Sequence, residues 1–213
     1  MKSYTNLKRE IIMNKIEKIW NSLFEYWKDN EPAFSGCIGA TQSEIDELEQ
    51  ALNIKLPESL KQSLKMCNSY PADYSNVKKS SCLVVGGAGE LYNTKNILES
   101  YNALKETMYY DGEAMTYDYL DKTFLSCDTK FSKNWIPIYS WNCDITAYLD
   151  LRLDSNIHGQ ILYEDIESGQ LGIWADSYED FLESIAKDIL EYGEYREGFK
   201  KVFERVNKET RIN

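Results

Sequence analysis

The residues of this sequence best suited to chemistry are the carboxylates between positions 144 and 191. This segment holds twelve Asp and Glu residues, opposed only by Arg152 and Lys187, and so carries −10 of the chain's net charge of −11. Clustered carboxylates could serve a glycosidase or a metal-dependent hydrolase. A glycosidase needs two carboxylates held at a set distance from each other across a cleft. Clustered acids are more often solvated side chains on the surface. We therefore keep a carboxylate hydrolase as an alternative and predict that the chain is not an enzyme.

Tyrosines and tryptophans lie among these carboxylates. The chain has 16 Tyr and 5 Trp, which is more than one core requires. Aromatic side chains anchor protein interfaces, and carboxylates steer a basic partner toward them. The alternative is that Trp135 and Trp174 pack in the core under the last predicted helix. We predict a partner-binding surface formed by Asp144, Tyr148, Asp150, Tyr163, Glu164, Asp165, Glu167 and Trp174. Of these residues, Glu164, Asp165 and Glu167 are predicted to be exposed.

Other motifs with chemical meaning are weak. His158 is the single histidine, so a catalytic triad or a His-based metal site would lack its usual partners. The glycines at 86, 87 and 89 are not followed by the Lys-Ser/Thr of a P-loop, and Glu90 lies where a phosphate would bind, so we expect a tight turn. The five cysteines have no Cys-x-x-Cys pair. They predict free thiols in a reducing compartment. We expect no catalytic residue, metal or cofactor.

Composition narrows the class of protein. The hydrophobic content of 43% and charged content of 28% are those of an ordinary soluble protein. No apolar run approaches the roughly 20 residues of a membrane span, and no signal peptide is visible. An acidic chain with a pI near 4.7 binds nucleic acid and anionic membranes poorly. These features predict a cytoplasmic protein that binds neither. Met1 and Met13 both remain candidate start residues.

Hydrophobic periodicity predicts an α+β fold. Residues 144–152 alternate as a strand with one buried face, and two further strands follow at 159–166 and 170–175. Asp176 or Ser177 can cap the helix that follows, and Thr94 can cap another that runs to Met108. Helical spacing also predicts helices over 5–29 and after Tyr192. A capping box at 41–44 begins a helix, and Leu56-Pro57 begins the next.

These elements predict one domain over residues 1–213, with a mixed or antiparallel sheet flanked by helices. Residues 1–12 are less periodic and form a candidate N-terminal extension. Residues 109–123 are rich in Tyr and acid, without a clear period, and we interpret them as a loop insertion.

Several short motifs resemble the Smi/Knr family of the SUKH superfamily. Residues 41–64 (TQSEIDELEQALNIKLPESLKQSL) resemble its N-terminal signature of a helix, Leu-Pro and a second helix. Further landmarks follow in order: WIPI at 135–138, LDL at 149–151, GQI at 159–161 and Ser-x-x-x-Phe-Leu at 177–182. The resemblance covers roughly residues 20–190. The chain departs from the family pattern at 140–144, where a glycine-rich turn is usual, and at Asn68-Ser69, where Asn-Gly is usual.

The resemblance implies an α+β domain with a mixed sheet flanked by helices. Bacterial members of the family are mostly cytoplasmic immunity proteins that bind and neutralise toxins, often nucleases, and fungal members regulate cell-wall synthesis. We therefore expect a binding module for a basic toxin domain, with a regulatory scaffold as the alternative. The toxin's identity and the oligomeric state are left open.

Overall fold

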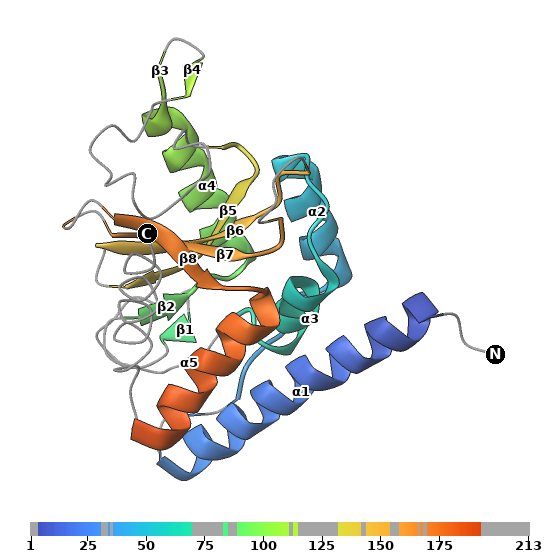
Figure 1. The fold of residues 1–213 in the computed structure, drawn as a ribbon. Helices are drawn as coiled ribbons and strands as arrows, with labels where there is room; N and C mark the ends of the chain where they lie inside the picture. The colour runs from blue at the N-terminus through green and yellow to red at the C-terminus, as the bar shows by residue number, and fades with distance from the viewer. Residues whose placement is uncertain are drawn as a thin grey trace, which may run out of the picture.

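The computed structural model describes residues 4–30, 34, 36–69, 83–84, 89–110, 113–114, 132–141, 144–153, 158–165, 167 and 170–192. The helices are α1 (Tyr4–Asn30), α2 (Gln42–Leu52), α3 (Glu58–Met66), α4 (Thr94–Met108) and α5 (Tyr178–Tyr192) (Figure 1). The strands are β1 (Leu83–Val84), β2 (Gly89–Leu91), β3 (Tyr109–Tyr110), β4 (Glu113–Ala114), β5 (Trp135–Trp141), β6 (Ile145–Asp150), β7 (Ile161–Asp165) and β8 (Gln170–Ala175).

Six of these strands form one sheet in the order β1-β2-β5-β6-β7-β8. Every neighbouring pair runs antiparallel. The predicted single-domain α+β fold is therefore confirmed. β3 and β4 pair with each other in a separate hairpin, inside the predicted insertion at 109–123, and the other residues of that insertion lie outside the described ranges. The limits of the domain at residues 1 and 213 and the role of residues 1–12 stay predictions, as does the helix after Tyr192, which is also outside the described residues.

The long helix α1 packs against α3 and α5, and Figure 1 shows α1 and α5 side by side at the border of the molecule away from α4. The indole Nε1 of Trp20 on α1 donates a hydrogen bond of 2.9 Å to the Ser63 hydroxyl on α3. Tyr178, the first residue of α5, donates one of 2.8 Å to the same Ser63 oxygen. Ser63 therefore joins three helices in the core, where it is 2% exposed.

The predicted helix starts agree with local capping chemistry. Thr41 accepts a 3.2 Å hydrogen bond from the Glu44 amide, and Glu44 accepts one of 2.7 Å from the Thr41 amide, which confirms the capping box of α2. Asn53 ends α2 in the left-handed conformation with a φ of 54°. Ser177, rather than Asp176, caps α5, because its hydroxyl accepts from the Asp180 amide at 3.2 Å.

One predicted cap is wrong. Thr94 lies inside α4, and the Asn93 side chain caps the helix by accepting a 2.8 Å hydrogen bond from the Asn96 amide. Asparagine is at least as good a cap as threonine. The Thr94 amide instead donates to Oδ1 of Asn68, at 2.8 Å. That side chain comes from the end of α3, and sequence spacing alone does not show such a contact.

The prediction that all cysteines are free thiols is also wrong. Cys37 and Cys67 form a disulfide across a Cα–Cα distance of 5.0 Å. They are 30 residues apart in sequence, and only the α2–α3 hairpin brings them together. Cysteine spacing without a known fold does not show such a pairing. The other three cysteines lie outside the described residues.

The sheet is buried on both faces, which corrects the expectation of one buried face. Ala147 and Leu149 belong to the main core cluster with the helices. Tyr148, which lies between them and points to the other face because side chains alternate along a strand, is also 0% exposed. Trp135 and Leu162 on neighbouring strands are equally buried on that second face. The alternation of apolar and polar residues in the sequence therefore reflects two faces that differ in polarity and not in exposure.

Candidate partner-binding surface

The structure buries most of the residues predicted to bind a partner. Six of the eight are nearly inaccessible, at 0% for Tyr148 and Asp150, 1% for Tyr163 and Glu164, 6% for Trp174 and 9% for Asp165. The expected exposure of Glu164 and Asp165 is therefore wrong, whereas Glu167 is exposed as expected. Side chains this inaccessible do not reach a partner without movement of the sheet.

The buried acids Glu164 and Asp150 are explained by their partners on the second face of the sheet. The Tyr148 hydroxyl donates a 2.7 Å hydrogen bond to Glu164. Arg152 forms an ion pair with Asp150, with 2.7 Å between Nη2 and Oδ2, and its Nε lies 3.0 and 3.1 Å from the two carboxylate oxygens. The guanidinium also lies 5.2 Å from the centre of the Trp135 ring. Buried carboxylates require such donors because desolvation of an unpaired charge is costly.

The buried aromatic residues on the other face form an edge-to-face cluster under α5. The Trp174 ring lies 5.1 Å from Phe181 at an interplanar angle of 90° and 5.5 Å from Tyr139 at 89°. Tyr163 meets Trp174 at 6.4 Å. Burial, together with the charge of Asp165, raises the pKa of Tyr163 to about 12. Trp174 therefore packs in the core under α5, as the core alternative predicted. Trp135 is buried too, but on the second face of the sheet against Tyr148, so its expected place under the last helix is wrong.

The two remaining predicted residues, Asp144 and Glu167, are accessible and lie on neighbouring turns. Asp144 precedes β6 and Glu167 follows β7, and the pairing of Ile145 with Asp165 brings these turns to the same end of the sheet. Asp144 is partly exposed and Glu167 is exposed. The register of the strands thus places at the same end of the sheet two carboxylates that are 23 positions apart in sequence.

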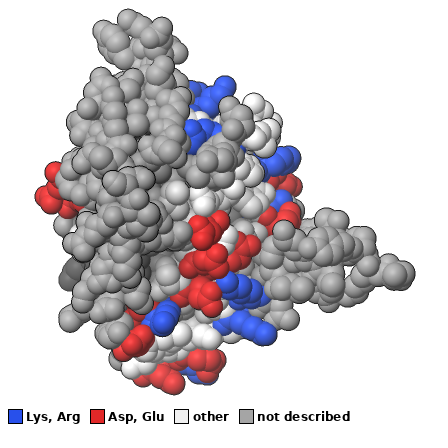
Figure 2. Space-filling view, in the orientation of Figure 1, with Lys and Arg blue, Asp and Glu red and all other residues white. Residues whose placement is uncertain are grey.

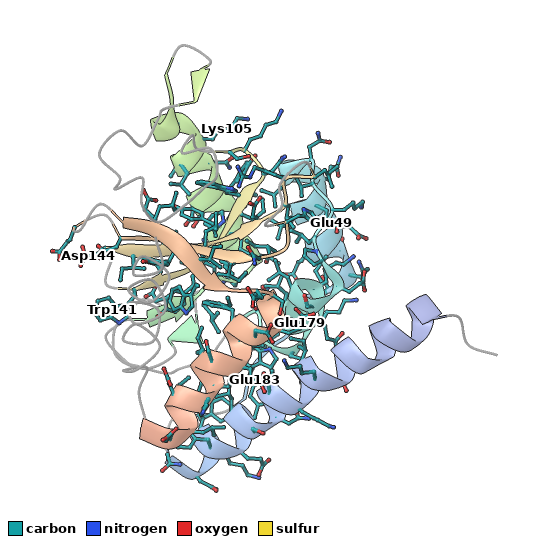
Figure 3. All side chains as sticks on the ribbon, in the orientation of Figure 1. Glu49, Lys105, Trp141, Asp144, Glu179 and Glu183 are labelled. Atoms are coloured by element: carbon teal, nitrogen blue, oxygen red, sulfur yellow. A yellow bond between two sulfur atoms is a disulfide. The ribbon has the colours of Figure 1, made fainter. Side chains whose placement is uncertain are left out.

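Trp141 completes this end of the sheet; the sequence shows it beside the acidic strands, but it was not among the eight residues predicted to bind a partner. It ends β5, is partly exposed, and its carbonyl accepts a 3.1 Å hydrogen bond from the Asp144 amide. Figure 3 shows Trp141 and Asp144 together at one end of the sheet, far from Glu179 and Glu183. We call Trp141, Asp144 and Glu167 the sheet-end patch.

A second acidic region lies at the start of α5. Figure 2 shows acidic side chains gathered there with basic ones beside them. Lys15 of α1 forms ion pairs with Asp180 at 3.0 Å and Glu183 at 2.8 Å. Burial opposes ionisation of Asp180, but hydrogen bonds from Ser177 and Lys15 outweigh it and lower the pKa of Asp180. Because Lys15 binds two of these acids, part of their charge serves to join α1 to α5.

No group of three or more His, Cys, Asp or Glu side chains within the described ranges could hold a metal ion. His158 is exposed, and its Nδ1 lies 2.9 Å from the Arg152 carbonyl oxygen. Gly89 and Glu90 lie in β2, where they pair with β5. Among the described helices, none is long and apolar enough to span a membrane.

Comparison with protein families assigns most of the described sheet and helices to one family match. The profile described as SMI1 / KNR4 family (SUKH-1) matches residues 39–184, about two thirds of the chain. The chain belongs to the SUKH-1 family. The match runs from just before α2 into the first turns of α5, so the SUKH-1 domain includes the whole sheet and the sheet-end patch, and α1 precedes it. A comparison with curated proteins found no match.

Proposed function

We propose that this SUKH-1 protein is a cytoplasmic immunity protein that binds and neutralises a basic toxin domain and has no catalytic activity of its own. Membership of the family supports a protein-binding role. The net charge of −11 supports a basic partner and disfavours nucleic acid. An acidic surface can cover the active region of a nuclease by replacing its anionic substrate.

The observation that carries the proposal is the composition of the sheet-end patch. It combines one partly exposed tryptophan with two accessible carboxylates on adjacent turns. Trp is enriched among the residues that dominate binding energy, and rim carboxylates accelerate the encounter with a basic partner. Asp144 and Glu167 therefore keep their predicted role in binding. The six buried residues act instead by holding the strands that carry these turns.

The acidic start of α5 contributes electrostatic steering close to the surface rather than direct contact. Asp180 and Glu183 keep side-chain exposures of 52% and 59%, although both bind Lys15. At physiological ionic strength the Debye length is about 8 Å, so such charges act mainly on partners already close to the surface. Together with the sheet-end patch, the acidic side chains of α5 attract a basic toxin that approaches from more than one direction.

A co-expression experiment tests the proposal. The full chain, tagged, is used to capture proteins from its native host, and any captured basic protein is then expressed alone and with this chain. The expected result is growth arrest by the captured protein alone and rescue by co-expression. A captured protein that is harmless alone, such as a signalling or cell-wall enzyme, would favour the regulatory scaffold instead.

A pair of variants makes the rescue specific to the proposed surface. Asp144→Lys combined with Glu167→Lys is expected to abolish rescue. The control combines Asp46→Lys with Glu47→Lys, which changes the net charge equally on the exposed face of α2 and is expected to rescue normally. Equal loss of rescue in both variants would show that overall charge, not the sheet-end patch, is responsible.

A further inference from the structure

The Cys37–Cys67 disulfide lies where the segment after α1 meets the end of α3. Cys67 is the C-cap residue of α3. Beside it, Ile38 and Ser69 form an isolated antiparallel bridge, in which the Ile38 amide donates to the Ser69 carbonyl at 2.9 Å. The amides of Asn68 and Ser69 both donate to the Ile38 carbonyl, at 2.8 and 3.0 Å. The covalent bond therefore closes a short patch of backbone pairing.

Residues 67–69 also contact the start of α4, through the side chain of Asn68. Oδ1 of Asn68 accepts a 2.8 Å hydrogen bond from the Thr94 amide, and its Nδ2 donates to the Thr94 hydroxyl at 3.2 Å. An amide at the start of a helix has no partner within the helix, so an outside acceptor stabilises the first turn. Asn68 is adjacent to Cys67. The position of the disulfide thus affects the start of α4 as well as the end of α3.

On its other side, the disulfide fixes the connection from α1. Phe34 packs against Trp27 and Phe24 of α1, with ring centroids 5.7 and 6.1 Å apart. Gly39 approaches α3 so closely that a Cβ atom there would lie 1.8 Å from the Lys65 carbonyl oxygen. Cys37 precedes the region matched by the SUKH-1 profile, and Cys67 lies inside it. The disulfide therefore links the N-terminal helix segment to the family domain.

The two cysteines differ in exposure. Cys67 is 7% exposed, whereas Cys37 is only partly buried. Thiol–disulfide exchange begins when a thiolate reaches one sulfur of the disulfide. A dithiol reductant would attack Sγ of Cys37 and release Cys67 as a thiolate that takes up a proton. The second thiol of the reductant would then release Cys37, so that two electrons and two protons reach the protein and the reductant becomes a disulfide.

From these contacts we propose that the Cys37–Cys67 disulfide is a redox-sensitive latch: reduction loosens the joint formed by residues 36–40, 67–69 and the first turn of α4, while the sheet stays folded. The joint is held by the three backbone hydrogen bonds at Ile38, by one of 2.8 Å from the Ala40 amide to the Leu64 carbonyl, and by the disulfide as its covalent link. The sheet has its own extensive core, with Ile136, Leu149 and Ile161 all at 0% exposure. The latch therefore acts locally.

The compartment decides the resting state of the latch. Cytosolic thiol systems keep most cysteine pairs reduced, whereas disulfides persist in oxidising compartments. In a cytoplasmic protein the latch is open at rest and closes on oxidation. This regulation does not depend on the proposed toxin binding, because the disulfide and its contacts all lie at the joint.

Hydrogen exchange on the full chain tests the latch. Oxidised wild type and wild type reduced with a phosphine are compared, and thiol titration after denaturation should count five thiols in the reduced sample and at most three in the oxidised one. On reduction the amides of Ile38, Ala40, Ser69 and Thr94 are expected to exchange at least tenfold faster. Amides of Ile136, Leu149 and Ile161 are expected to keep their rates. The melting temperature is expected to fall by about 4–16 °C.

The variant Cys37→Ser with Cys67→Ser serves as the control. It is expected to show the fast exchange of the reduced protein with or without phosphine, because no disulfide can form. Unchanged exchange at the joint after reduction of wild type would overturn the proposal. So would five free thiols under oxidising conditions, or a simultaneous loss of protection throughout the sheet, since the latch would then be absent or global.

Discussion

The Tyr148 hydroxyl donates a 2.7 Å hydrogen bond to Oε2 of Glu164, and both side chains are at most 1% exposed. The two residues lie on adjacent strands, β6 and β7, and on the second face of the sheet. A buried carboxylate is stable only where donors replace its water. This pair therefore joins two strands and leaves neither residue available to a partner.

Tyr148→Phe should destabilise the protein by about 1–3 kcal/mol, because the ring remains while a buried carboxylate loses a donor. Urea unfolding measures this as a lower midpoint with an unchanged slope. Tyr26→Phe is the control, since the partly exposed Tyr26 hydroxyl has no hydrogen bond within the described part of the chain, and it should change stability by less than about 0.5 kcal/mol. Equal stability of the two variants would count against a structural role for the Tyr148–Glu164 bond.

Local patterns in the sequence predicted the elements well. Capping residues such as Thr41 and Ser177 act within four positions of themselves, so their chemistry is legible without a fold. Alternation at Ala147 and Leu149 likewise located a strand. Distant partners were not predictable in this way: the disulfide partner of Cys37 and the contact of Asn68 with Thr94 both depend on how separate elements pack.

The candidate binding residues show the same limit. Acidic and aromatic residues in alternate positions of a strand indicate a solvent-exposed face. Asp150 and Glu164 are nevertheless buried, because Arg152 and Tyr148 donate hydrogen bonds to them. Sequence predicted which residues were chemically unusual and not which of them were exposed. The sequence did not show the register of the strands, and it is this register that places the turns of Asp144 and Glu167 at the same end of the sheet.

Gly89→Ala should be destabilising through a steric clash with a single hydroxyl. A Cβ at position 89 would lie 2.4 Å from the Tyr139 hydroxyl oxygen and 3.1 Å from the ring carbon behind it. The ring cannot retreat easily, because it is fully buried and packs edge-on against Trp174 and Phe181. Overpacking of this kind costs about 1–3 kcal/mol. Thermal or chemical unfolding of the variant measures the cost.

A double-mutant cycle separates this clash from a general intolerance of the strand. Gly89→Ala should cost less in a Tyr139→Phe background, because the nearest atom is removed. Gly172→Ala provides the contrast: its Cβ would lie 2.6 Å from a ring carbon of Tyr163 and 3.1 Å from the hydroxyl oxygen, so Tyr163→Phe should give much less relief. Equal relief in the two pairs, or relief in neither, would contradict the assignment.

Acid should remove the contribution of the α2 capping box. Hydrogen bonds from the Thr41 backbone and side chain lower the pKa of Glu44 from its ordinary value of 4.5. A lowered folded-state pKa stabilises the protein above the unfolded value, and this stabilisation is lost as the pH falls through the folded value. The stability advantage of wild type over Glu44→Gln should therefore be constant near neutral pH and decline below about pH 4.5. Unfolding curves between pH 3 and 7 measure it.

Thr41→Ala removes the reciprocal half of the box and should cost about 0.5–2 kcal/mol at neutral pH. In that variant the decline with acid attributable to Glu44 should be weaker, since the Thr41 hydroxyl is one of its donors. An advantage of wild type over Glu44→Gln that grows on acidification would show that the pKa of Glu44 is raised, and so would contradict the capping geometry.

Replacing the acids of the sheet-end patch should slow association with the basic partner captured from the host. Rim charges act mainly on the on-rate and are screened by salt. Surface plasmon resonance at two salt concentrations should therefore show slower and less salt-dependent association for Asp144→Lys with Glu167→Lys. The control, Asp46→Lys with Glu47→Lys, carries the same charge change on α2 and should associate nearly as fast as wild type.

Trp141→Ala should act on dissociation instead, because a buried interface aromatic contributes through packing and not through long-range attraction. We expect a faster off-rate and a loss of roughly 2 kcal/mol or more in binding free energy. Trp141 also packs partly against the core, so binding is normalised to the folded fraction measured by circular dichroism. An off-rate equal to that of wild type, together with a control variant that associates as slowly as the patch variant, would place the interface elsewhere on the domain.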